Sequence, residues 1–286
     1  MMSRILAALL LWLAHAPALA DSYESVLRFV RDGAVVKEIP LEALREGCTA
    51  EKVAVDDPYY QRPKVFVGCR LSDVLKLGFG RVPSADSREN FFLRARDGYT
   101  KPAPGGRLAE PGAYVAFADA EHAVGDDPGW QPIDRRQVDP GPFYLIWSGD
   151  GQNDIHRYPW PYQLATIEIA PFESEYPNTL PAGVPEASPA LTGFAIFRSE
   201  CIACHAINGE GGVVGPELNV PRSIVEYRPA AQIKAFVRDP ESFRYTSMPP
   251  HRHLTDADLD GLIAYFHAMK DRKRDPRQPA SRLNVK

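Results

Sequence analysis

The sequence has 286 residues, of which 44% are hydrophobic and 24% charged, a composition that excludes a disordered or fibrous protein. The formal net charge is −4, so the basic surplus of a nucleic-acid-binding protein is missing. Four cysteines are too few for a disulfide scaffold of this size. We therefore expect a globular chain, long enough for two domains, with no nucleic-acid partner.

The first twenty residues have the pattern of a secretory signal peptide. Arg4 is followed by an apolar run over residues 5–14, and Ala18 and Ala20 form a small-x-small cleavage site. The run is too short to span a bilayer, and no later stretch approaches the length of a transmembrane helix. We expect residues 1–20 to be removed and the mature chain, without a membrane span, to reach the oxidising periplasm.

Residues 21–170 are predicted to be mostly strands. Two apolar runs, 26–30 and 35–39, flank Asp32-Gly33, a pair that suits the tight turn of a hairpin. β-branched and aromatic runs predict further strands at 52–56, 64–67, 114–117, 143–147 and 165–169. Short helices are expected at 41–45 and at 72–76, the second capped by Ser72. The Pro/Gly/Asp-rich segments 98–111 and 121–142 are predicted to be long loops.

Residues 171–190 are rich in proline, which occupies five of the twenty positions. Proline fixes φ and donates no backbone hydrogen bond, so this segment cannot be a core helix or a central strand. The composition predicts a semi-rigid extended linker between two domains.

Residues 191–286 are predicted to be helical, ending in a short polar tail. Helical patterns cover 191–199 and 230–237, and the last helix follows Thr255, which with Asp258 forms a shortened capping box. The predicted fold class is therefore α+β: a mostly-β domain at 21–170, followed after the linker by an all-α domain.

One motif in the second domain carries specific chemistry. Cys201-Ile202-Ala203-Cys204-His205 is C-x-x-C-H, the attachment signature of c-type haem. Thiols three residues apart reach the two vinyl groups of one porphyrin edge, and the following His ligates the iron. A thioredoxin-like redox pair would need a βαβ unit, and a zinc site a second Cys/His pair nearby, and the sequence offers neither. We expect one covalent haem c.

The sixth iron ligand is expected downstream of the motif. Only Met248 and Met269 remain after the signal peptide; Met248 lies in a loop between two helices, whereas Met269 lies on the apolar side of the last helix. His251 and His253 are rivals in the same loop, with the alternative that both are polar loop residues. We predict Met248, whose thioether favours reduced iron and raises the potential.

Residues 191–270 resemble class I cytochrome c. The matching positions are Gly193 and Phe197 in the first helix, Gly215-Pro216-Glu217-Leu218 as the family's G-P-x-L, Met248-Pro249, and Tyr265 with Phe266 in the last helix. The resemblance implies that the Pro216 carbonyl receives the ring N–H of His205 and fixes its tautomer. It also implies that the last helix crosses the first at a small residue.

The first domain is similar to the molybdopterin-binding domain of the sulfite oxidase family, on five segments: 39–44, 68–75, 97–99, 113–116 and 167–169. The resemblance implies a mixed α+β fold in which one cysteine at a strand end binds molybdenum. Here the corresponding strand ends at Asp56-Asp57-Pro58, without a cysteine. We therefore expect a cofactor-free relative that binds no molybdopterin.

The other features of the first domain leave alternatives open. Cys48 and Cys69 form a disulfide or are two buried thiols, with molybdenum ligation as a third interpretation. The run Tyr158-Pro159-Trp160-Pro161-Tyr162 is a docking surface or a packed loop. His122 and His156 lie isolated in polar loops, with a metal role as the alternative interpretation.

Three functions fit these observations. The first is a periplasmic electron carrier whose N-terminal domain docks a periplasmic redox protein. The alternative is a molybdopterin-dependent oxidoreductase of the sulfite dehydrogenase type, with Cys48 or Cys69 as metal ligand and the fused haem as electron acceptor. The third is a haem-based sensor or peroxidase, which needs an open iron site, and the intact Met-Pro loop argues against it.

Overall fold

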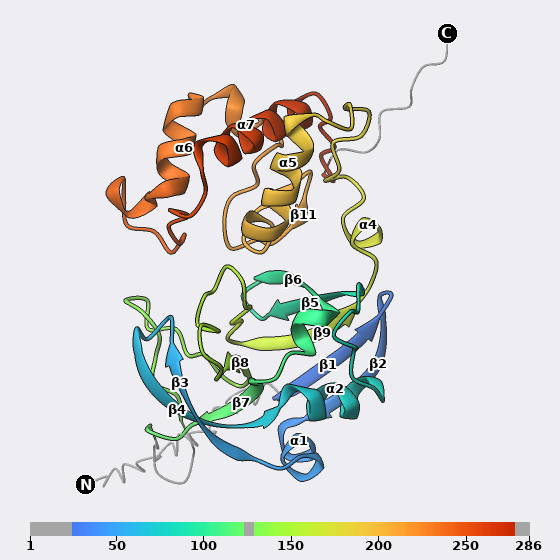
Figure 1. Ribbon diagram of the computed structural model, residues 1–286, viewed down its shortest axis with the longest axis vertical. Coiled ribbons are helices and arrows are strands. Elements are labelled where there is room, and N and C mark those ends of the chain that lie inside the picture. The colour runs from blue at the N-terminus through green and yellow to red at the C-terminus, as the bar shows by residue number, and fades with distance from the viewer. Residues whose placement is uncertain (1–24, 123–128, 278–286) are drawn as a thin grey trace, which may run out of the picture.

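The computed structural model describes residues 25–122 and 129–277, so the predicted signal peptide lies outside the described residues. Figure 1 shows the strands β1 to β9 at one end of the molecule and the helices α5 (Pro189–Ile196), α6 (Ala230–Arg238) and α7 (Asp256–Lys270) at the other. The sheet-rich region precedes the helical region along the chain, in agreement with the predicted α+β class.

The first sheet has five strands in the order β2-β1-β9-β5-β6. They are β1 (Val26–Arg31), β2 (Ala34–Pro40), β5 (Asn90–Ala95), β6 (Thr100–Pro104) and β9 (Leu164–Ile169). The hairpin β1–β2 is confirmed, with Asp32 and Gly33 at positive φ in its turn. Strand β9 pairs parallel with β1 and antiparallel with β5, which returns the end of this region to the centre of the sheet.

The second sheet has four antiparallel strands in the order β3-β4-β7-β8. They are β3 (Glu51–Asp57), β4 (Arg62–Arg70), β7 (Ala113–Asp119) and β8 (Tyr144–Trp147), all at predicted positions. The helix α1 (Leu41–Gly47) is also confirmed. The predicted Ser72 cap is wrong, because β4 runs directly into α2 (Leu71–Phe79) and Arg70 holds the N-cap position.

The predicted loop at 98–111 is also wrong. It contains β6 and the one-turn helix α3 (Gly105–Leu108), and β6 pairs with β5, which was not predicted either. Pro102 and Pro104 concealed the strand because proline cannot donate to a ladder. An edge strand tolerates proline, and β6 is the edge of its sheet.

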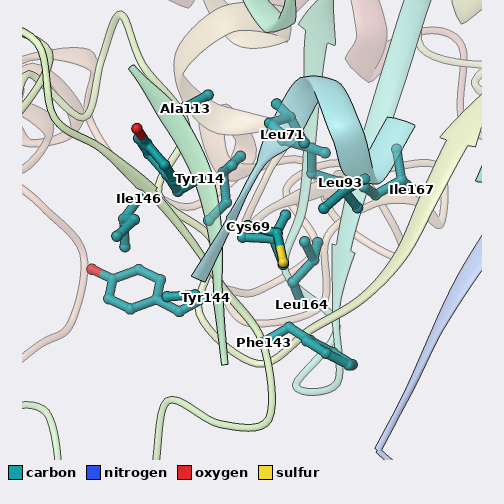
Figure 2. Close-up of a cluster of buried hydrophobic side chains, with 14 of the residues drawn as sticks. Cys69, Leu71, Leu93, Ala113, Tyr114, Phe143, Tyr144, Ile146, Leu164 and Ile167 are labelled. Atoms are coloured by element: carbon teal, nitrogen blue, oxygen red, sulfur yellow. The ribbon is translucent and has the colours of Figure 1, made fainter. Parts of the chain in front are cut away.

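The two sheets share one hydrophobic core. Figure 2 shows Leu93 and Ile167 of the first sheet close to Cys69, with Tyr114 and Tyr144 of the second sheet in the same cluster. Cys69 also forms a disulfide with Cys48, with Cα atoms 6.0 Å apart, which ties the end of α1 to β4. Of the three interpretations of this pair, the structure contains the disulfide.

The proline-rich segment 171–190 packs closely instead of extending freely. It contains the short helix α4 (Phe172–Glu175), and the rings of Phe172 and Tyr176 are buried with Phe92 of β5. The Tyr265 hydroxyl of α7 donates to the carbonyl oxygen of buried Thr179 at 2.7 Å. This segment therefore belongs to the packing between the two regions.

The helical region also follows the sequence closely. Helix α5 continues into a π-helical turn at Phe197–Cys201, and 3₁₀ turns lie at Ile224–Glu226 and Pro240–Ser242. The predicted capping box is confirmed: Thr255 Oγ1 accepts from the Asp258 N–H, and the Asp258 carboxylate from the Thr255 N–H. The domain is not all-α, because β10 (Ala206–Ile207) and β11 (Glu210–Gly211) form a small hairpin.

In the described parts of the chain, no helix has the length and apolar character needed to cross a membrane.

Helices α5 and α7 cross at two glycines. A Cβ atom on Gly193 would lie 2.0 Å from the Gly261 carbonyl oxygen, so only glycine permits this approach. The crossing places the aromatic face of α7 beside the turn that carries the C-x-x-C-H motif, where Phe197 packs on Tyr265 and Phe266. The small residue at this crossing is what the class I cytochrome resemblance implies.

Candidate functional site

A cavity of about 640 Å³ lies where the helical region meets the sheet-rich region. This volume lies within the range of small-molecule and cofactor sites, which is roughly 300–1,000 Å³. Its walls include all five residues that the sequence singled out: Cys201, Cys204, His205, Pro216 and Met248. The structure therefore brings the predicted site residues together around one space.

The two motif cysteines lie on a tight turn at the end of the π-helical segment. The His205 N–H donates to the Cys201 carbonyl at 2.9 Å, which holds the motif in this turn. Both thiols are free, and burial raises the pKa of Cys201 to about 12 and that of Cys204 to about 11. A redox-active pair needs a lowered thiol pKa, so this environment argues against a thioredoxin-like function.

The imidazole of His205 has a fixed orientation. Its Nδ1–H donates to the Pro216 carbonyl oxygen at 2.9 Å, which leaves Nε2 as the ligating nitrogen. A Cβ atom on Gly215 would lie 2.4 Å from His205 Cε1, so the glycine provides the space for the ring. Burial lowers the pKa of His205, which favours the neutral imidazole that binds metals.

Met248 lies in the loop between α6 and α7. Its side chain is half-buried against the core of the helical region and lines the same cavity as His205. Its backbone N–H donates to Thr246 Oγ1 at 3.1 Å, which helps to shape the loop. Met269 is buried in the core, and His251 lines the cavity but packs its ring against His156.

The sheet-rich region supplies another wall of the cavity, which the sequence did not predict. Most of its lining side chains are aromatic or basic, among them Tyr59, Tyr99, Lys101, Trp160 and Tyr162, and Asp97 adds an acidic side chain. Trp160 is buried and donates to the Gln152 carbonyl at 2.9 Å, so the 158–162 run is a packed loop that also faces the cavity. No local pattern marked Tyr59, and Tyr99 was noted only within segment 97–99 of the family resemblance, because the fold alone brings both residues to this cavity.

Hydrogen bonds join the edge strand β6 to the motif turn. The Thr100 N–H donates to the Ala203 carbonyl at 2.9 Å, and the Lys101 ammonium donates to the Ser199 carbonyl. On the neighbouring strand β5, Asn90 Oδ1 accepts from the Arg198 guanidinium at 2.7 Å. The first region is therefore in direct contact with the segment that carries the cysteines.

The residues present fit a covalently bound haem. Two free thiols, a neutral and oriented imidazole, and a thioether line a cavity of suitable size, and Ile233, Leu262 and Phe266 add apolar walls. In c-type haem sites, two thiols attach the porphyrin covalently, and an imidazole and a thioether ligate the iron.

Comparison with known proteins agrees with this chemistry. Residues 188–266 match the family model described as cytochrome c oxidase, cbb3-type, subunit III. The chain is also 31% identical over 94 residues to cytochrome c oxidase subunit 2 of Alkalihalophilus pseudofirmus (strain ATCC BAA-2126 / JCM 17055 / OF4). That alignment covers 30% of this chain and 27% of the relative. The C-terminal region thus carries a cytochrome c domain, which supports a haem-based electron-transfer protein.

Proposed function

We propose that this chain is a periplasmic monohaem c-type cytochrome that transfers single electrons through a haem ligated by His205 and Met248. The observation that carries the proposal is the oriented, neutral His205 in the same cavity as the Met248 thioether. When bound, haem supplies a one-electron Fe(III)/Fe(II) couple. Cys201 and Cys204 attach it covalently, and Pro216 holds the His205 ring in the ligating tautomer.

The periplasmic location has two supports. The predicted signal peptide directs export, and the Cys48–Cys69 disulfide is a bond that persists in oxidising compartments.

The N-terminal domain acts in this proposal as a docking module for a periplasmic redox protein. Its support is the contact between β6 and the motif turn, together with the aromatic side chains that wall the cavity. A partner that approaches the motif turn from the side of β6 would meet the sheet-rich region first. The disulfide occupies both cysteines of this domain, so neither offers a thiolate to molybdenum, which favours the carrier over the molybdopterin enzyme.

The test is a spectroscopic redox titration of the full chain, matured with haem in a host supplied with molybdenum. We expect one haem per chain and one reversible couple. Met248→Ala should lower the potential and let the reduced protein bind carbon monoxide. Met269→Leu, a control at the other methionine, buried in α7, should change neither property.

Other outcomes select the rival functions. An unchanged potential in Met248→Ala would remove the proposed ligand. Stoichiometric molybdenum in the wild-type protein would establish the oxidoreductase. Carbon monoxide binding to the native wild-type protein would indicate a sensor or a peroxidase.

A further inference from the structure

Three metal-binding side chains from distant parts of the sequence meet beside the motif turn. They are His156 from the loop between β8 and β9, Glu200 from the π-helical turn, and His251 from the loop before α7. One potential ligand atom from each lies within 4.8 Å of the other two. Among them, His156 Nδ1 and Glu200 Oε2 are 2.8 Å apart.

A fourth side chain stands at the edge of this cluster. His253 Nε2 lies 3.5 Å from the same Glu200 oxygen, and its ring centroid is 4.1 Å from that of His156. Unlike His251, His253 is substantially exposed to solvent. The gathering of three imidazoles around one carboxylate corrects the sequence interpretation of His156 as isolated. His251, which was a rival of Met248 or else a polar loop residue, is buried in this cluster.

His251 gives independent evidence that this cluster lacks a binding partner. The residue is only 3% exposed, and its Nδ1 is buried without a hydrogen-bond partner among the described residues. Buried polar atoms in native proteins are almost always paired, and an unpaired one is unfavourable. A ligand bound between these side chains would supply the missing partner.

His251 and Glu200 have protonation states that suit a cation, whereas a metal bound at His156 Nδ1 would displace the proton that this atom shares with Glu200. Burial lowers the pKa of His251 and so favours the neutral imidazole, which has a free lone pair. Burial alone would raise the pKa of Glu200, but the hydrogen bond from His156 and the charge of Lys101 lower it overall, so the carboxylate is ionised at neutral pH.

We propose that His156, Glu200 and His251 bind one divalent first-row transition-metal ion of the Zn²⁺ or Cu²⁺ class. Imidazole and carboxylate donors without a thiolate are typical ligands of these ions. With Zn–N bonds of about 2.0–2.1 Å, ligand atoms at tetrahedral angles lie roughly 3.3 Å apart. The His156–Glu200 pair, at 2.8 Å, would have to open by about 0.5 Å, and the separations to His251, which are at most 4.8 Å, would have to close by at most about 1.5 Å. His253 or water completes the coordination.

The metal would join the two regions of the protein. His156 belongs to the sheet-rich region, whereas Glu200 directly precedes Cys201 and His251 follows the Met248-Pro249-Pro250 segment. One ion would thus fasten the loop between β8 and β9 to both segments that frame the cavity. His156, Glu200 and His251 also line the cavity proposed for haem, but none of them is a proposed iron ligand, and the metal proposal does not depend on His205 or Met248.

The experiment titrates the haem-loaded full chain, stripped with EDTA and then freed of chelator, with Zn²⁺ and separately with Cu²⁺ in a calorimeter. We expect one ion to bind per chain. Comparison of the affinities for Zn²⁺ and Cu²⁺ identifies the preferred metal. His156→Gln and Glu200→Gln should each weaken binding at least about tenfold. His267→Gln removes an exposed histidine of α7 and should leave binding unchanged.

A second readout is thermal unfolding. Bound metal should raise the melting temperature of the wild-type protein and of His267→Gln, but not that of His156→Gln. The proposal is overturned if the wild-type protein binds neither ion at 1:1 stoichiometry, or if His156→Gln and Glu200→Gln bind as the wild type does. Retained metal binding together with an unchanged potential in Met248→Ala would reject the proposed haem ligation but not this site.

Discussion

Lys64 is a charged residue inside the core of the first region. Its side chain has no exposed surface, and its ammonium contacts Asp119 Oδ2 at 2.6 Å and Glu121 Oε2 at 3.2 Å. The ammonium also lies 4.9 Å from the centre of the Tyr60 ring. Alternation along β4 places Lys64 on the same face as Phe66, so the charge is buried and depends on its partners.

This dependence makes Asp119→Asn strongly destabilising. The substitution keeps the shape of the side chain but leaves a buried ammonium without its main counter-charge, and we expect a loss of about 3–5 kcal/mol of unfolding free energy. Urea denaturation measures this loss. Glu38→Gln breaks the exposed Arg28–Glu38 pair and should cost at most about 1 kcal/mol, so equal losses in both variants would contradict the argument.

At the scale of single residues, the sequence predicted functional residues only where a motif of neighbouring positions marks them. Cys201, Cys204 and His205 are adjacent, so their spacing alone indicated haem attachment. The strand over residues 64–67 was also predicted, but the burial of Lys64 was not, because Asp119 is distant in sequence. The contact of His156 with Glu200 was not predicted either, because the two residues are distant in sequence and only the packing of the two regions brings them together.

The helix crossing of α5 with α7 is the best-specified packing between elements. Gly193→Ala would place a Cβ atom 2.0 Å from the backbone oxygen of Gly261. Because this neighbour is a backbone atom, the clash is relieved only if one of the two helices shifts. We expect a loss of about 1–3 kcal/mol, the usual cost of overpacking. Thermal unfolding of the haem-loaded protein measures it.

The matched control for this prediction is Gly261→Ala on the facing helix. There the new Cβ atom would meet its nearest neighbours at 3.3 Å, a distance that small shifts relieve. Gly261→Ala should therefore be much less destabilising than Gly193→Ala. Similar losses in the two variants would mean that the crossing tolerates a methyl group on either side.

The disulfide stabilises the junction of α1 with β4. Cys48 and Cys69 are 21 residues apart, and loop-closure entropy gives their bond about 3 kcal/mol of stability. The double variant Cys48→Ala/Cys69→Ala should lose about this amount in urea denaturation. Reduction of the wild-type protein should cause a similar loss but leave the double variant unaffected, and a reductant effect on the variant would point to another cause.

Elements were predictable where their signals were short-range. Thr255 and Asp258 marked the start of α7 because a capping box lies within four residues. By contrast, β6 depends on pairing with β5, and Pro102 and Pro104 suppressed the local strand pattern. Strand β6 is also the element that contacts the motif turn, so the missed strand concealed part of the site.

At the scale of the whole molecule, the two regions form one functional unit around the cavity. The edge strand β6 donates to the motif turn through Thr100 and Lys101. The segment 171–190, predicted as a linker, is packed against both regions. We therefore expect a charge on the sheet-rich region to act on the proposed redox centre of the helical region.

Lys101 provides the test of this coupling. Its ammonium lines the cavity, and a nearby positive charge disfavours oxidised iron, which carries one more positive charge than reduced iron. Lys101→Met should therefore lower the reduction potential at pH 7, by an amount on the order of tens of mV. Lys37→Met makes the same chemical change on β2, where the ammonium donates to the Leu77 carbonyl, and should leave the potential unchanged. Equal potentials in the Lys101→Met variant and the wild-type protein would show that the sheet-rich region does not tune the haem electrostatically.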